Sequence, residues 1–94
     1  MNQLQQHAIA LLKKEEARGG IKVNIDRDTS GIFVSSLYAD YFITATNRGY
    51  KLTYYHYKWD DETDQMESWP YDEGARLSDN LVELAELIID DVRN

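Results

Sequence analysis

The chain has 94 residues and a net charge of −7, with 43% hydrophobic residues, 12% aromatic residues and no cysteine. This composition excludes a disordered polar tail, and it excludes disulfides, thiolate nucleophiles and cysteine metal sites. The length predicts a single domain, residues 1–94, with one hydrophobic core.

The first residues of the chain do not show the pattern of a signal peptide. The longest uninterrupted apolar stretch, at 8–12, has five residues. A membrane-spanning helix needs ~20 apolar residues. We therefore expect a cytoplasmic protein that has no membrane partner.

Residues 2–18 have the periodicity of an amphipathic helix, and Gly19 and Gly20 are placed to end it. The inward face of this helix is expected to carry Leu4, Ala8, Leu11 and Leu12. The residues expected outside that face are Lys13, Lys14, Glu15 and Glu16.

A meander of short strands is predicted next, at about 21–26, 31–38, 41–47 and 50–59. The turns between them are expected at Asp28–Gly31, at Ala39–Asp40 and at Asn47–Gly49, the last as a three-residue loop with Gly49 in a left-handed conformation. A long connection is expected over 60–77. Within it, a fifth strand at 65–69, hairpinned back onto the fourth, is left open.

A second amphipathic helix is predicted at 79–92, with Ser78 as its N-cap. Its inward stripe is expected to carry Leu81, Leu84, Ala85, Ile88 and Val92. Asp90 and Asp91 are unfavourably placed, because the C-terminal end of a helix dipole is negative. The predicted class is α+β: a helix, an antiparallel meander of four or five strands, and a helix, with both helices on one face of the sheet.

Charge is divided unevenly along the chain. Residues 1–58 carry eight Lys/Arg and five Asp/Glu, a balance of +3, whereas residues 59–94 carry two and twelve, a balance of −10. Carboxylates spaced along a loop can attract a basic partner, and nearby aromatic side chains can anchor the contact. The partner-binding residues predicted on this basis are Asp60, Asp61, Glu62, Asp64, Glu67, Trp69, Tyr71, Asp72 and Glu73.

The aromatic fourth strand offers a second surface, formed by Tyr50, Tyr54, Tyr55, Tyr57 and Trp59. Aromatic and basic residues on a sheet are typical of proteins that bind single-stranded nucleic acids. The net charge of −7 argues against nucleic acid, because phosphate binding needs several positive side chains. Since two helices can cover only one face, we also expect an exposed aromatic patch, which could support a homodimer.

No catalytic, cofactor-binding or metal-binding residues are assigned. Asp60, Glu62 and Asp64 alternate as in a calcium loop, but Gln65 and Tyr71 occupy the positions where an EF-hand needs glycine and glutamate. His7 and His56, the only histidines, have no ligand partners at zinc-site spacing.

The expected function is that of a non-enzymatic binding module for a basic protein surface. In size, charge and order of elements the chain resembles phage-encoded inhibitors of host nucleases, including the anti-CRISPR proteins. This resemblance implies an inhibitor or immunity-type role and transfers no site residues. Two alternatives stay open: a binder of small molecules or single-stranded nucleic acid that uses the fourth strand, and a small enzyme.

Overall fold

A computed structural model describes residues 3–29 and 31–94. The fold is α+β, with an N-terminal helix, a five-stranded antiparallel sheet and a C-terminal helix, as the sequence predicts. Asn2 and Ser30, which we assign from the sequence to the first helix and the first turn, lie outside the described residues.

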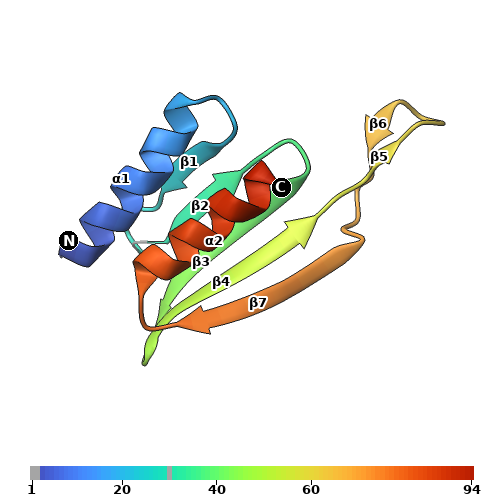
Figure 1. Ribbon diagram of the computed structural model, residues 1–94. Coiled ribbons are helices and arrows are strands. Elements are labelled where there is room, and N and C mark those ends of the chain that lie inside the picture. Colours follow the sequence, from blue (N-terminus) through green and yellow to red (C-terminus); the bar gives the residue numbers. More distant parts are fainter. Residues whose placement is uncertain (1–2, 30) are drawn as a thin grey trace.

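The described elements, in chain order, are α1 (Gln3–Ala17), β1 (Lys22–Ile25), β2 (Ile32–Ser35), β3 (Ala39–Thr46), β4 (Gly49–His56), β5 (Trp59–Asp60), β6 (Gln65–Met66), β7 (Asp72–Ser78) and α2 (Leu81–Arg93). The main sheet has the strand order β1-β2-β3-β4-β7, and every neighbouring pair is antiparallel. The small hairpin β5–β6 interrupts this meander and projects beyond the end of the sheet (Figure 1).

Both helices lie on the same face of the sheet, where they contact each other (Figure 1). The core forms between them and the inward side chains of the strands, because alternate residues of a strand point to opposite faces. Its fully or almost fully buried members include Leu12, Val34, Ile43, Leu52, Leu84 and Ile88. Neither helix covers the opposite face, which we call the open face.

The first helix buries Ala8 and Leu12 completely, whereas Leu4 remains 38% exposed. The prediction that Glu15 lies outside the inward face is wrong, since only 6% of this residue is exposed. Its carboxylate is buried because it binds Arg93 of α2. Sequence periodicity cannot anticipate a partner 78 residues away.

Two of the predicted turns are shifted. Ala39 and Asp40 belong to β3, and the turn before them contains the exposed residues Leu37 and Tyr38. The amide of Ser36 closes this turn by donating to the carbonyl of Ala39 at 2.8 Å. Gly49 has the expected positive φ, 145°, but it pairs with Thr46 as the first residue of β4 instead of completing a three-residue loop.

The largest correction concerns the long connection predicted over 60–77. Its last part is a strand, β7, which pairs with β4 along seven residues, from Tyr50↔Ser78 to His56↔Asp72. The strand left open at 65–69 forms only in part, as β6 (Gln65–Met66), and it pairs with Asp60 and Trp59 of β5 and not with β4. The fourth strand therefore ends at His56 and not at residue 59.

The second helix begins later than predicted. Ser78 is the last residue of β7, and the N-cap is Asn80, whose side-chain oxygen accepts from the amide of Val82 at 3.0 Å. The four buried positions of α2 match the predicted stripe, and Val92 is partly buried against them. Neither described helix is long and apolar enough to cross a membrane.

Candidate functional site

The segment between β4 and β7, residues 57–71, is here called the acidic arm. Its outer part is the β5–β6 hairpin, in which Trp59 pairs with Met66. The intervening turn forms because Asp60 Oδ1 accepts from the amide of Glu62 at 2.9 Å, and Asp64 takes a left-handed conformation with φ of 55°. Aspartate tolerates that conformation better than most residues.

The acidic arm combines charge with exposed aromatic area. It carries five carboxylates and one lysine, a net charge of −4. Trp69 is 82% exposed, Tyr71 57% and Trp59 44%. A monomer gains nothing from leaving the indole ring of Trp69 in water, whereas tryptophan and tyrosine are enriched at the centres of protein interfaces. The arm therefore has the composition of a contact surface.

The structure separates the predicted partner-binding residues into three places. The arm holds seven of them: Asp60, Asp61, Glu62, Asp64, Glu67, Trp69 and Tyr71. Asp72 is at the base of the arm, where it binds His56, and Glu73 is on the open face opposite Tyr55. Only the first group forms a continuous segment that projects from the domain (Figure 1).

The second predicted surface is divided between the two faces of the sheet. Tyr50 and Tyr54 pack against the core on the helix side. Tyr55 is on the open face, where its ring meets Phe42 edge to face with centroids 6.1 Å apart. Tyr57 and Trp59 belong to the arm. The open face has its own aromatic row, because the rings of Phe33 and Phe42 are also in contact, with centroids 4.7 Å apart.

A polar cluster that we did not assign from the sequence lies at the base of the arm. His56, the last residue of β4, is bound on both sides of its ring: Nδ1 is 2.9 Å from Asp72 Oδ2 and Nε2 is 2.7 Å from Asp91 Oδ2. Tyr41 of β3 also donates its hydroxyl to Asp91. The cluster thus joins β3, β4, β7 and α2.

The cluster shifts the pKa values of its members. Burial of the ring disfavours the charged form of His56, but the hydrogen bonds to Asp91 and Asp72 outweigh it, so the pKa of His56 is raised. Burial likewise opposes ionisation of Asp91, yet the hydrogen bonds from His56 and Tyr41 lower its pKa. The pKa of Tyr41 is raised, by burial first and by Asp91 second.

This geometry limits the chemistry that the cluster can perform. An ionised carboxylate only accepts hydrogen bonds, so both contacts are satisfied only when each ring nitrogen carries a proton. In that state neither nitrogen can accept a proton from a substrate. The two carboxylates also bind opposite sides of the ring and do not converge on a common point. In residues 3–29 and 31–94, no group of three or more His, Cys, Asp or Glu could hold a metal ion.

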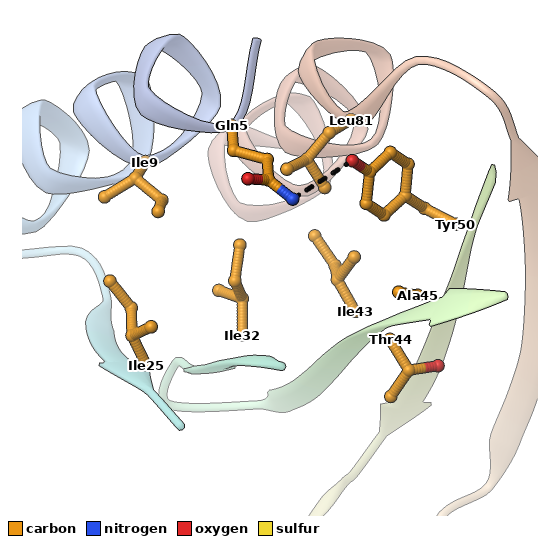
Figure 2. Close-up of a pocket in the computed structure, with 9 residues that line it drawn as sticks. All are labelled: Gln5, Ile9, Ile25, Ile32, Ile43, Thr44, Ala45, Tyr50 and Leu81. Atoms are coloured by element: carbon orange, nitrogen blue, oxygen red, sulfur yellow. Dashed lines mark hydrogen bonds between the residues drawn. The ribbon is translucent and has the colours of Figure 1, made fainter. Parts of the chain in front are cut away.

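Two hollows of different character lie on the helix side of the sheet. An open cleft of about 220 Å³ borders the cluster, and its lining includes Tyr54, Arg76 and Leu87. A smaller cavity of about 20 Å³ lies between α1 and the sheet (Figure 2). There Gln5 donates from Nε2 to the hydroxyl of Tyr50 at 3.3 Å, above Ile32 and Ile43. This cavity has room for about one water molecule and for no larger ligand.

The sequence contained one sign of the cluster. Asp91 lies where the helix dipole disfavours an acid, and the structure supplies the compensating partners, His56 and Tyr41. The partners themselves are not predictable, because the sequence places Asp72 in a loop and gives no local sign that β4 pairs with β7. No protein-family model, curated protein or solved structure matches the chain.

Proposed function

We propose that the protein is a non-enzymatic binding module that docks on a basic protein surface through the acidic arm. The observation that carries this proposal is Trp69, which is 82% exposed on a projecting segment. The carboxylates around it would steer a positively charged partner, and the aromatic side chains would hold the partner after contact.

The form of the arm supports this function. The arm extends an elongated molecule of 47 × 28 × 25 Å, and its hairpin stands clear of the helices (Figure 1). A projecting hairpin can enter a groove of a partner. A row of carboxylates also imitates the charge of a phosphate backbone, so inhibition of a nucleic-acid-binding protein would be one form of this function.

The test is affinity capture from the source cell, with mass spectrometry to identify the proteins retained. A variant with Asp61→Lys, Glu62→Lys and Asp64→Lys should lose the specific partner, and so should Trp69→Ala. The matched control reverses three exposed acids outside the arm, Asp79→Lys, Glu86→Lys and Asp90→Lys, and changes the net charge equally. The proposal fails if both triple variants lose, or both keep, the same captured proteins.

A second candidate function uses the open face. Phe33, Phe42 and Tyr55 form a row of touching rings there, and such rows bind the bases of single-stranded nucleic acids. Lys22 and Lys51 lie on this face, but Asp40 and Glu73 lie there too. Addition of a thymidine oligonucleotide should quench tyrosine fluorescence if this candidate is right, and Phe42→Ala should abolish the quenching.

A further inference from the structure

The base of the acidic arm is built around His56. The arm leaves the sheet immediately after this residue and returns at Asp72, which is paired with it in the strand register. The carbonyl of His56 also accepts from the amide of Tyr71, at 3.0 Å. The two ends of the arm are therefore joined at one residue, whose ring reaches Asp91 in the last turns of α2.

We propose that His56 is a protonation-dependent clamp that fixes the base of the acidic arm to the C-terminal helix. With both nitrogens protonated, the ring donates to Asp72 on the arm side and to Asp91 on the helix side. A neutral ring has a single N–H, so one of these carboxylates would instead face a nitrogen lone pair. Loss of one proton therefore opens one side of the clamp.

The charged and titratable neighbours come from every element around the ring. Besides Asp72 and Asp91, the cleft contains Tyr41 from β3, Tyr54 from β4 and Arg76 from β7. The ring of Tyr71, from the arm, lies 6.3 Å from that of His56, and Lys58 Nζ is 4.7 Å from the Tyr71 ring. Histidine is the one residue type among these that ordinarily changes charge near neutral pH.

The direction of the switch follows from the contacts. The hydrogen bonds to Asp91 and Asp72 raise the pKa of His56 above its ordinary value of 6.5 despite partial burial. A group whose pKa is raised on folding stabilises the folded state below its unfolded pKa, and this contribution is lost as pH rises through the folded pKa. At the acid end, the pKa of Asp91 is lowered below 3.8. The clamp is therefore closed at pH values between the pKa of Asp91 and the pKa of His56 in the folded protein. It opens when the pH rises above the pKa of His56.

Opening would change the arm more than the core. Only 21% of the His56 side chain is exposed, and its ring binds Asp72, while the backbone carbonyl of His56 accepts from the amide of Tyr71. The hairpin beyond them is tied to itself by strand pairing and by the Glu67 amide, which donates to the carbonyl of Lys58 at 2.9 Å. It should therefore move as one piece about the freed base.

The test follows the isolated protein by NMR from about pH 5 to about pH 9, across the range in which histidine titrates. We expect the His56 ring nitrogens to titrate together with the backbone amides of the arm, and the protection of the Tyr71 amide to fall as the clamp opens. Asp91→Asn should shift the His56 midpoint to lower pH. Asp90→Asn, an exposed neighbour on the same helix, should leave the midpoint unchanged, and His7→Gln assigns the other histidine signal.

The coupling of this clamp to partner binding rests on the proposed function, but the clamp itself does not. The clamp is refuted if His56 titrates as an exposed histidine does, or if the arm amides ignore its titration. If Asp91→Asn does not fold, Asp72→Asn should shift the His56 midpoint in the same direction. His56→Gln should leave the backbone amides of the arm insensitive to pH over this range. A pH-dependent arm in a protein that captures no partner would refute the function and retain the clamp.

Discussion

Arg93 of α2 binds Glu15 of α1 through two nitrogens, with Nε 3.0 Å from Oε1 and Nη2 3.1 Å from Oε2. Two parallel hydrogen bonds between a guanidinium and a carboxylate fix both the distance and the orientation of the groups. The pair joins the two helices through residues 78 positions apart, so it connects the beginning and the end of the chain.

The first prediction concerns this ion pair. Arg93→Met should lower the melting temperature by several degrees because it leaves the carboxylate of Glu15, a residue only 6% exposed, without its partner. Replacing both residues by methionine should be less harmful than Arg93→Met alone. Arg27→Met, at an exposed arginine, is the control. Equal melting temperatures for Arg93→Met and the control would contradict the structural role of the pair.

The same pair gives a second, pH-dependent prediction. The hydrogen bond from Arg93 lowers the pKa of Glu15 below 4.5, although burial opposes ionisation. A lowered pKa means that the stabilisation is present above the unfolded pKa and is lost as pH falls through the folded value. The difference in melting temperature between wild type and Arg93→Met should therefore shrink below about pH 4. A difference that is constant down to this pH would argue against an ionised Glu15.

The third prediction tests the core beneath α2. Leu84 is completely buried, so Leu84→Ala should lower the free energy of unfolding by about 2–5 kcal/mol. Leu77 of β7 is 71% exposed on the open face, and Leu77→Ala should change it by less than about 0.5 kcal/mol. Urea denaturation measures both. Similar losses in the two variants would mean that the open face is covered in solution.

These leucines also show what the sequence could and could not predict. Leu84 lies on a strong 3.6-residue stripe, which is a local signal, and the stripe was predicted correctly. Leu77 lies in an edge strand whose other residues are mainly charged or small. Such composition protects an edge from unwanted pairing, but it also resembles a loop. Strand β7 forms because it pairs with β4, and the residues of β7 alone do not indicate this pairing.

The candidate site divides in the same way. The carboxylates and aromatic residues of the acidic arm were predictable, because composition and exposure in a long connection are local properties. The His56 cluster was not, since its members are brought together from β3, β4, β7 and α2. Only the misplaced charge of Asp91 indicated it, and one misplaced charge does not name its partner.

The fourth prediction uses two glycines to separate backbone strain from crowding. A Cβ at Gly49 would lie 2.7 Å from the carbonyl oxygen of Ser78 and 2.8 Å from Cα of Asp79, and φ is 145°. Gly19 also has a positive φ, 93°, but nothing lies within 4 Å of its added Cβ. Gly19→Ala should cost about 1–2 kcal/mol of stability from conformation alone. Gly49→Ala should cost more, because the backbone entering α2 must also shift. If both variants lost the same stability, the positive φ alone would account for the loss at Gly49, and the crowding would contribute nothing.

The last prediction concerns how the acidic arm would bind. Raising the salt concentration from about 0.05 to about 0.5 M shortens the Debye length from ~14 to ~4 Å, so association with a basic partner should slow. Reversal of Asp61, Glu62 and Asp64 should slow association in the same way, because steering depends on the sign of the field.

Trp69→Ala should change the dissociation rate and not the association rate. The indole ring makes no contribution to steering, so its loss should speed dissociation and leave association nearly unchanged. Binding kinetics with the captured partner, measured at both salt concentrations, separate the two effects. None of the variants should unfold the protein, since the altered side chains are exposed. Asp64→Lys adds the cost of a left-handed lysine, which is confined to the turn of the β5–β6 hairpin. The affinity could also be unchanged by salt, by the charge reversals and by the loss of Trp69. In that case the carboxylates of the arm serve solubility. The open face, with Phe33, Phe42 and Tyr55, then becomes the surface to test.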